Sequence, residues 1–288
     1  MKKYTIVKFS TITIMTFFML LGSACKKGNV GSTSGTSPVS IYLTDDPTLV
    51  FDNLFIDIQK VEVKAEDDSE AINESEHEAE HDESDRNGST DGGWVNLTIT
   101  PGVYDLLKFR NGIDTILGTG NFQINKNLKK IRITLGQNNH GVLNGVTVPL
   151  VIKDKNNIIV IKLDESLLSS NNGRFELSVD IDASRSVQQH GNEFELKPEV
   201  HGFNRIKSAG IEGKVLPADS HAIVYAINGS DTTSTMASSE GEFKITGLKT
   251  GVYTLLVHAT TNNYRDSITT VNVSGNEDMH IATITLHK

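Results

Sequence analysis

The sequence predicts an all-β fold made of two antiparallel β-sandwich-like domains. Apolar and polar residues alternate over many short runs, turn-forming residues separate the runs, and no long amphipathic helix interrupts them. A period of two places alternate side chains on one buried face, which is typical of a half-exposed strand. Many brief strands of this kind favour an antiparallel sandwich or barrel, and of these we expect the sandwich.

Residues 39–63 open the first predicted domain with two strand-like runs around an Asp-Asp-Pro turn that ends at Pro47. The alternating apolar positions are Val39, Ile41, Leu43, Leu54, Ile56 and Ile58. Val61 and Val63 continue the pattern in the opposite phase. Because one extra residue in a strand reverses this phase, we predict a one-residue bulge near Lys60.

Further strands are predicted after residue 93. Residues 95–99 alternate, and in 131–135 the apolar positions alternate with Arg132 and Thr134. Asn144-Gly145 lies between two apolar runs and is a two-residue hairpin signal. Residues 164–170 give the one hint of a helix, which would be short.

The segments IYLTDDP (41–47) and IDIQKVEV (56–63) resemble the start of an uncharacterised family, domain of unknown function 4382. Further matching pieces follow in the expected order up to about residue 203: Trp94-Val95, Asp105 to Leu107, Ile131 to Leu135, Asp180 to Asp182 and Leu196 to Pro198. Members of this family occur in the envelopes of bacteria and archaea without an assigned activity. The resemblance therefore implies a class of protein and no catalytic residue.

Residues 208–288 are predicted to form a second, smaller β domain, with His201 to Ser208 as the transition. Seven strands are expected there: 211–215, 222–228, 232–237, 242–245, 252–258, 267–273 and 280–286. The segments EGEF (240–243) and GLKTGVYTL (247–255) resemble carboxypeptidase regulatory-like and Cna-B-type domains, which have a transthyretin-like, carbohydrate-binding-like fold. Cna-B-type domains can carry a Lys–Asn crosslink; because residues 280–286 contain no Asn, we expect none here.

The start of the chain predicts export and lipid attachment. Three lysines precede an apolar run over residues 11–21, which is shorter than a membrane-spanning helix and has the length of a signal-peptide core. Residues 21–25 (LGSAC) then resemble a bacterial lipobox, although Gly22 stands where an aliphatic residue is usual. We predict a signal peptide over 1–24, acylation (palmitate) of Cys25 and a flexible tether over 25–38.

The predicted location of the protein and its net charge limit the partners that it can bind. Lys26 after the cysteine lacks the Asp of an inner-membrane retention signal, so we expect an outer-membrane lipoprotein, facing either the periplasm or the cell surface. The formal net charge of −9 becomes −12 when the three lysines of the signal are removed. Phosphate contacts need a basic patch, and none is evident, so a nucleic-acid partner is not expected.

Residues 66–93 form a polar insertion between two strand-like runs, and 66–85 contain 11 Asp or Glu and no Lys or Arg. We interpret it as a solvated acidic loop. Glu74, His77, Glu78 and His81 nevertheless follow i, i+3, i+4, i+7 spacing and would share one face of a helix. Two imidazoles one turn apart can chelate zinc, nickel or copper, so a divalent cation is an alternative cofactor at this loop.

Two further candidate sites have residue patterns that are less specific for a ligand. Asp180 and Asp182 lie two apart on one strand, so they could share a cation with Asp45 or Asp46, although such residues more often face water or bond turn amides. Tyr264, in an Asn-Asn-Tyr loop, is the aromatic residue best placed for a sugar.

No nucleophile elbow, zinc-protease helix motif or phosphate-binding glycine loop occurs, so we do not expect an enzyme. The sequence favours a lipid-anchored envelope protein with a non-enzymatic binding or structural role. It attaches to the membrane through its lipid, and its further partners would be glycans or another envelope protein. The alternatives are a carbohydrate-binding lipoprotein and a protein that binds a metal cation through the acidic loop.

Overall fold

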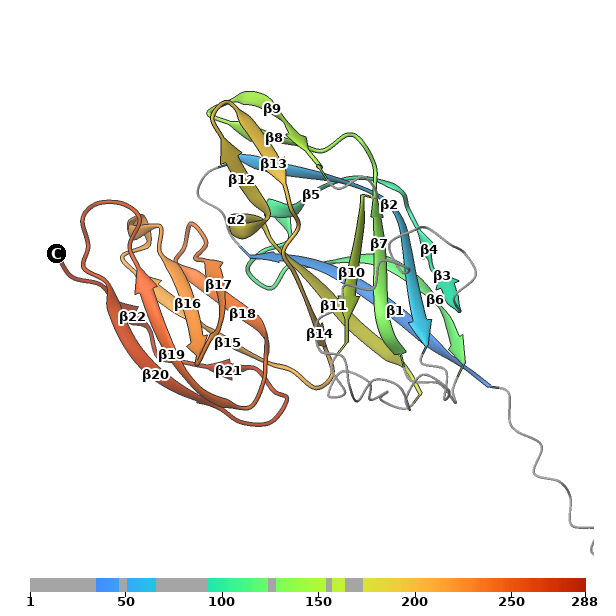
Figure 1. The fold of residues 1–288 in the computed structure, drawn as a ribbon. Coiled ribbons are helices and arrows are strands. Elements are labelled where there is room, and N and C mark those ends of the chain that lie inside the picture. The colour runs from blue at the N-terminus through green and yellow to red at the C-terminus, as the bar shows by residue number, and fades with distance from the viewer. Residues whose placement is uncertain (1–34, 47–50, 66–92, 124–127, 154–156, 164–172) are drawn as a thin grey trace, which may run out of the picture. The chain divides into compact units, whose positions relative to one another are not determined.

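The computed structural model describes residues 35–46, 51–65, 93–123, 128–153, 157–163 and 173–288. Strands dominate these residues and helices are restricted to single short turns, which confirms the predicted all-β class (Figure 1). The predicted signal peptide, Cys25, the tether up to residue 34, the four acidic-loop residues and the helix at 164–170 lie outside the described residues. The last residues of the predicted tether, 36–38, belong to the first strand. No helix in the described part of the chain is both long and apolar enough to cross a membrane.

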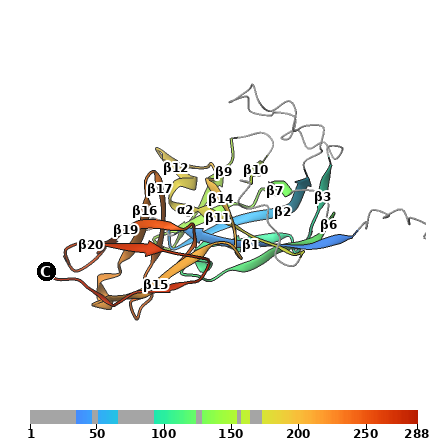
Figure 2. The same cartoon turned by 90° about the horizontal axis from the view of Figure 1, so that it is seen from below.

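The first sheet has the strand order β14-β11-β1-β6-β4. Its strands are β14 (Val200–Asn204), β11 (Phe175–Asp182), β1 (Thr36–Asp46), β6 (Thr115–Gln123) and β4 (Thr98–Ile99). In Figure 2, β1 is seen with its neighbours β11 and β6. The pairing of β1 with β11 is parallel over eight residue pairs, from Val39↔Phe175 to Asp46↔Asp182, whereas β1 with β6 and β11 with β14 are antiparallel. The sheet is therefore mixed.

The second sheet is built on the long strand β2 (Asn53–Ala65). The other strands are β10 (Ile158–Lys162), β7 (Leu128–Leu135), β8 (His140–Leu143), β9 (Val146–Val151), β13 (Glu193–Leu196), β12 (Val187–His190), β3 (Trp94–Asn96) and β5 (Gly102–Asp105). Two helical turns, η1 (Leu106–Lys108) and α2 (Ala183–Ser186), follow β5 and β11. The order β10-β7-β2-β8-β9-β13-β12 has β3 and β5 as further partners of β2.

Two local predictions are confirmed by the pairing. The β2–β7 register shifts between Ile58 and Lys60, which is the bulge expected from the change of phase at Val61. Asn144 and Gly145 connect β8 to β9 with φ of 51° and 76°, the left-handed values that a two-residue turn of this kind requires.

The inward faces of both sheets share one hydrophobic cluster, which we call the first core. Its members come from residues 39–196, and they include the alternating apolar residues of β1, β2 and β7. Side chains such as Ile41, Leu54 and Ile133 are completely buried. Burial of this apolar surface is the main force that holds the two sheets together.

A second hydrophobic cluster, the second core, is formed by residues 209–286. One sheet contains β18 (Glu242–Leu248), β15 (Ala209–Leu216), β21 (Met279–His280) and β22 (Ile284–Thr285); the other contains β17 (Asp231–Met236), β16 (Ile223–Asn228), β19 (Gly251–His258) and β20 (Ser267–Val273). A short turn, η3 (Ala218–Ser220), follows β15. Six of the seven expected strands are present, and the seventh, 280–286, is divided into β21 and β22, both parallel to β15.

The two cores are connected by a hydrogen-bonded turn. Asn204, which is 1% exposed, accepts bonds at Oδ1 from the backbone N–H of Ile206 (2.9 Å) and of Lys207 (3.2 Å). Its carbonyl accepts the N–H of Ser208 at 3.0 Å. Residues 34–288 form one compact unit by their contacts, so both cores belong to it.

Candidate binding site between the two cores

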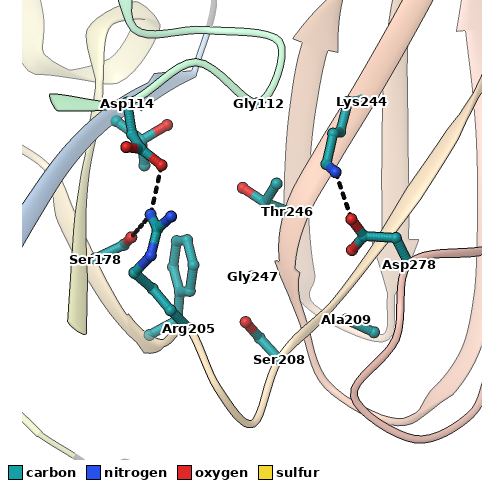
Figure 3. Close-up of a pocket in the computed structure, with 12 residues that line it drawn as sticks. Gly112, Asp114, Ser178, Arg205, Ser208, Ala209, Lys244, Thr246, Gly247 and Asp278 are labelled. Atoms are coloured by element: carbon teal, nitrogen blue, oxygen red, sulfur yellow. Dashed lines mark hydrogen bonds and ion pairs between the residues drawn. The ribbon is translucent and has the colours of Figure 1, made fainter. Parts of the chain in front are cut away.

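A polar pocket of about 190 Å³ lies where the first and second cores meet (Figure 3). We call it the crevice. One wall comes from β1, β11, β14 and the loop before β6, and the other comes from β15, β18 and the loop before β21. The hydroxyl-bearing residues that line it are Thr44, Ser178, Ser208 and Thr246.

Arg205 defines the first wall. Its Nη1 donates to Asp114 Oδ2 at 2.5 Å and to Ser178 Oγ at 3.1 Å. Its guanidinium also stacks on Tyr42, 4.0 Å from the centre of the ring. Arg205 is the first residue after β14, so these contacts fix the beginning of the connecting turn to the first core.

Lys244 defines the second wall. Its ammonium pairs with Asp278 and lies 3.7 Å from Glu212 Oε2. Burial lowers the pKa of Lys244, but the carboxylates of Asp278 and Glu212 outweigh burial, so the pKa is raised above its usual value. In Figure 3, this pair and the Asp114–Arg205 pair lie on opposite sides of the crevice. Each ion pair therefore joins two residues of the same wall and does not cross the crevice.

Asn111 connects the walls. Its Oδ1 accepts the backbone N–H of Lys244 at 2.6 Å, and its Nδ2 donates to the carbonyl of Glu242 at 3.3 Å. We call this pair of bonds the Asn111 fork. The backbone at Asn111 has φ of 59°, and at Gly112 it has φ of 76°. A Cβ on Gly112 would lie 2.7 Å from Lys244 Cδ, so a larger residue would displace the Lys244 side chain and would also be strained at this φ.

Of the four strand aspartates that were expected to share a cation, Asp46 and Asp182 are register partners, whereas Asp45 lies apart from Asp180. Asp45 pairs in register with Ile181 and so lies on the opposite face of the sheet from Asp180. Asp45 Oδ1 accepts the N–H of Ala183 at 3.2 Å. Asp182 caps α2: its Oδ1 accepts Ser184 Oγ–H at 2.6 Å and Arg185 N–H at 3.0 Å. The side chain of Asp46 lies outside the described part.

No group of three or more His, Cys, Asp or Glu in the described ranges is arranged to hold a metal ion.

The hydrogen bonds by which Asp182 caps α2 explain why the pKa of its carboxyl is lowered. Burial raises the pKa of its carboxyl, but the bonds from Ser184 and Arg185 outweigh burial and hold the pKa below its usual value of 3.8. Asp182 therefore bonds turn amides, which is the more common role of an aspartate at the end of a strand.

Tyr264 is half-buried against the second core. Its hydroxyl donates to Asp219 Oδ1 at 3.2 Å, and Lys288 Nζ lies 5.0 Å from the centre of its ring. Burial and the Asp219 carboxylate raise its pKa. The ring therefore packs partly against the second core, and sugar binding by Tyr264 stays a prediction.

The sequence did not suggest the buried charge next to the acidic insertion. Arg132 is 1% exposed although its alternation placed it opposite the apolar face. Its Nε donates to Glu62 Oε2 at 2.7 Å, and its guanidinium lies 4.2 Å from the centre of the Trp94 ring. Lys64 pairs in register with Trp94, so β2 and β3 hold the two ends of the insertion side by side. The one tryptophan of the chain, directly after the insertion, was the available signal.

Comparison with known proteins gives one family match. A family model described as "Domain of unknown function (DUF4382)" matches residues 36–198. No curated protein matches the chain.

Solved structures give remote similarities. The Bacillus anthracis TIE protein is 12% identical, with 87% of this chain and 34% of that chain covered and a TM-score of 0.23. The shaft pilin SpaA from Lactobacillus rhamnosus GG is 8% identical (88% and 97% covered, TM-score 0.22), and a minor pilin of Streptococcus agalactiae is 11% identical (86% and 94%, 0.22). The chain thus spans about a third of the length of the first of these. TM-scores this low carry no argument about function.

Proposed function

Because the chain belongs to the DUF4382 family, whose description assigns no activity, we propose from its own residues that it is a lipid-anchored, non-enzymatic protein of the cell envelope. In this proposal it has a binding or structural role, and its two β cores act together as one unit beyond the membrane surface.

The observation that carries the structural part of the proposal is the Asn111 fork. β18 is the outer strand of its sheet, and the carboxamide of Asn111 bonds both a backbone N–H and a backbone carbonyl of that strand. The Arg205 ion pair and the Asn204 turn fix the connection on the other side of the crevice. Directional bonds at two places resist rotation of one core against the other better than a flexible linker does.

The anchor is supported by the sequence. A signal-peptide core is followed by LGSAC, and Cys25 is the one cysteine in the chain. Acyl chains on Cys25 would supply the membrane attachment. The absence of Asp after the cysteine supports the outer membrane.

We also propose that the cores correspond to domains over residues 39–203 and 208–288. The separate membership of the two hydrophobic clusters supports this division. An isolated fragment of 208–288 that unfolds cooperatively on heating would support the boundary, and a fragment without a cooperative transition would contradict it.

The anchor is tested by labelling cells with an alkyne analogue of palmitate and separating membranes from soluble proteins. We expect the unaltered chain to carry label and to sediment with membranes. The Cys25→Ser variant should lose the label and should be either released or left with an uncleaved signal. Thr33→Ser, an equally small change in the tether, should behave like the parent. A processed Cys25→Ser variant that still sediments fully with membranes would contradict the proposal.

A further inference from the structure

Three lysines lie in one row across the outer face of the second sheet. Lys162 of β10 is the register partner of Lys130 in β7, and Lys130 is the register partner of Lys64 in β2. The next position along the row is Trp94 of β3, opposite Lys64 (Figure 1). Each lysine has a chain neighbour that is buried in the first core, so the lysines lie on the other face of the sheet. We call Lys162, Lys130 and Lys64 the lysine row.

The lysine row places like charges next to each other. Residues directly opposite in an antiparallel pair have their Cβ atoms about 5 Å apart, and two like charges at such positions destabilise the sheet. The row contains two such pairs in succession, Lys162 with Lys130 and Lys130 with Lys64. This arrangement favours a negatively charged partner that covers the row.

The neighbouring rows of the same strands do not balance this charge. Among their described residues the charged ones are Arg132, Glu62 and Lys60. Glu62 bonds both Arg132 and Lys60, each at 2.7 Å, so its charge is already used by these two groups. The described residues of the three rows therefore carry five basic groups, which are the lysine row, Arg132 and Lys60, and one carboxylate. The positive excess remains after the ion pairs of Glu62 are counted.

The acidic insertion is joined to the chain at one end of the lysine row. β2 ends at Ala65, directly after Lys64, and β3 begins at Trp94. Residues 66–92 connect these two strands and lie outside the described residues. In the sequence, 66–85 contain 11 Asp or Glu and no Lys or Arg. The most acidic segment of the chain is therefore attached where the described residues leave positive charge.

The length of the insertion and its attachment both suit the row. Three strand spacings, about 15 Å, separate Trp94 from Lys162 across the sheet. Half of the insertion in extended form reaches about 40 Å, so its carboxylates can meet every lysine of the row. A segment attached in this way is present at an effective concentration of the order of millimolar, which an external partner has to exceed.

We propose that the lysine row is the docking surface for the chain's own acidic insertion. Carboxylates of residues 66–85 contact the three ammonium groups through charge-assisted bonds, next to the Trp94 ring. The insertion thereby neutralises the row and keeps external polyanions away from this face of the sheet. This assigns an intramolecular partner that the proposed envelope role does not specify, and it does not depend on the lipid anchor.

The first test is zero-length crosslinking of the full chain in a non-ionic polyoxyethylene detergent. A carbodiimide joins an ammonium to a carboxylate where the two are in contact, and mass spectrometry of the digest identifies the joined pairs. We expect Lys130 and Lys162 to be joined to residues 66–85, and at least about fivefold less often in about 0.5 M salt, which screens the attraction. Lys108 is 73% exposed in η1, outside the row, and should not be joined to the insertion. No crosslinks from the row, or equally frequent ones from Lys108, would overturn the proposal.

An external polyanion is the competing occupant of the row. At about 50 mM salt the parent chain should pass through a heparin column without retention, because its own carboxylates cover the lysines. Retention of the parent that is lost in the combined Lys130→Gln and Lys162→Gln variant would assign the row to an external polyanion and would overturn the proposal.

The same double variant tests whether the lysines hold the insertion. A glutamate-specific protease cleaves a segment at a rate that follows how often the segment is undocked. Lys130→Gln combined with Lys162→Gln should therefore speed cleavage within residues 66–85 by at least about threefold at low salt. Lys108→Gln is the matched control and should leave the rate unchanged, and thermal melting checks that each variant is folded. An unchanged rate in the double variant, or an equal increase in the control, would overturn the docking.

Discussion

The backbone N–H of Lys244 donates to Oδ1 of Asn111 at 2.6 Å, and two residues earlier the carbonyl of Glu242 accepts Nδ2 of the same side chain at 3.3 Å. Residues 242 and 244 point their edge-facing groups to the same side of β18. One carboxamide therefore occupies the positions that a neighbouring strand would fill. It also covers an exposed strand edge, which would otherwise be open to pairing with another chain.

Replacement of Asn111 by glycine should remove both bonds of the fork while keeping a residue that tolerates its φ of 59°. The expected loss in free energy of unfolding is about 1–2 kcal/mol, because each such bond contributes about 1 kcal/mol. Urea denaturation of the full chain measures it. Asn144→Gly is the matched control, since Asn144 has φ of 51° in the exposed β8–β9 turn. An equal loss in both variants would show that the fork is not the cause.

Replacement of Arg132 by methionine should destabilise the protein strongly. The Glu62 side chain, 3% exposed, would lose the guanidinium that neutralises it, and breaking a buried pair in this way typically costs about 3–5 kcal/mol. Lys60→Met removes the second partner of Glu62, a lysine that is 38% exposed, and should cost less than about 1 kcal/mol. Urea denaturation compares the two. Similar losses would contradict the assignment of Arg132 as the main partner.

Glu62 should make stability depend on pH in the acid range. Burial raises the pKa of its carboxyl, but the bonds from Arg132 and Lys60 outweigh burial, so the folded-state pKa lies below its ordinary value of 4.5. Such a group contributes stability that is fully present above the unfolded pKa and is lost as pH falls through the folded pKa. Asp182 acts in the same direction, also from a lowered pKa.

Urea denaturation between about pH 7 and about pH 3 should therefore show a free energy of unfolding that decreases toward acid, and Glu62→Gln should flatten this decrease. At about pH 7 the free energy of unfolding of the variant should be lower than that of the parent, because the glutamine amide cannot neutralise Arg132. A slope that is identical in the variant and the parent would contradict the role of Glu62.

The strands were predictable because their signals are local. Alternation of apolar residues predicted β1, β2 and β7, the phase change predicted the bulge in β2, and Asn144-Gly145 predicted the β8–β9 turn. The parallel pairing of β1 with β11 was not predictable, because its partners are separated by more than a hundred residues and no local pattern selects between them.

The candidate sites were less predictable, since each depends on contacts between distant segments. Periodicity placed Arg132 on the outer face of its strand, but a tryptophan beyond the acidic insertion covers it. Two aspartates on one strand suggested a cation, but Asp182 is used to cap α2.

The acidic insertion remains a prediction from the sequence alone. If Glu74, His77, Glu78 and His81 share one face of a metal-bound helix, zinc should increase the helical circular dichroism of a peptide spanning residues 66–86. Replacement of both histidines by alanine should remove the response. The affinity should be modest, because ordering the backbone costs about 1 kcal/mol per residue. No calorimetric signal with zinc, nickel or copper at about 1 mM would leave only a charged insertion.

The central claim, that the two cores act as one unit, is tested most directly by the distance distribution between two spin labels, measured by pulsed electron resonance. His190 in β12 and His280 in β21 are 53% and 82% exposed in their side chains, so cysteines there, in a Cys25→Ser background, disturb little. The account predicts a single narrow distribution, broadened by Asn111→Gly and unchanged by Asn144→Gly. A broad distribution without any Asn111 substitution would contradict it.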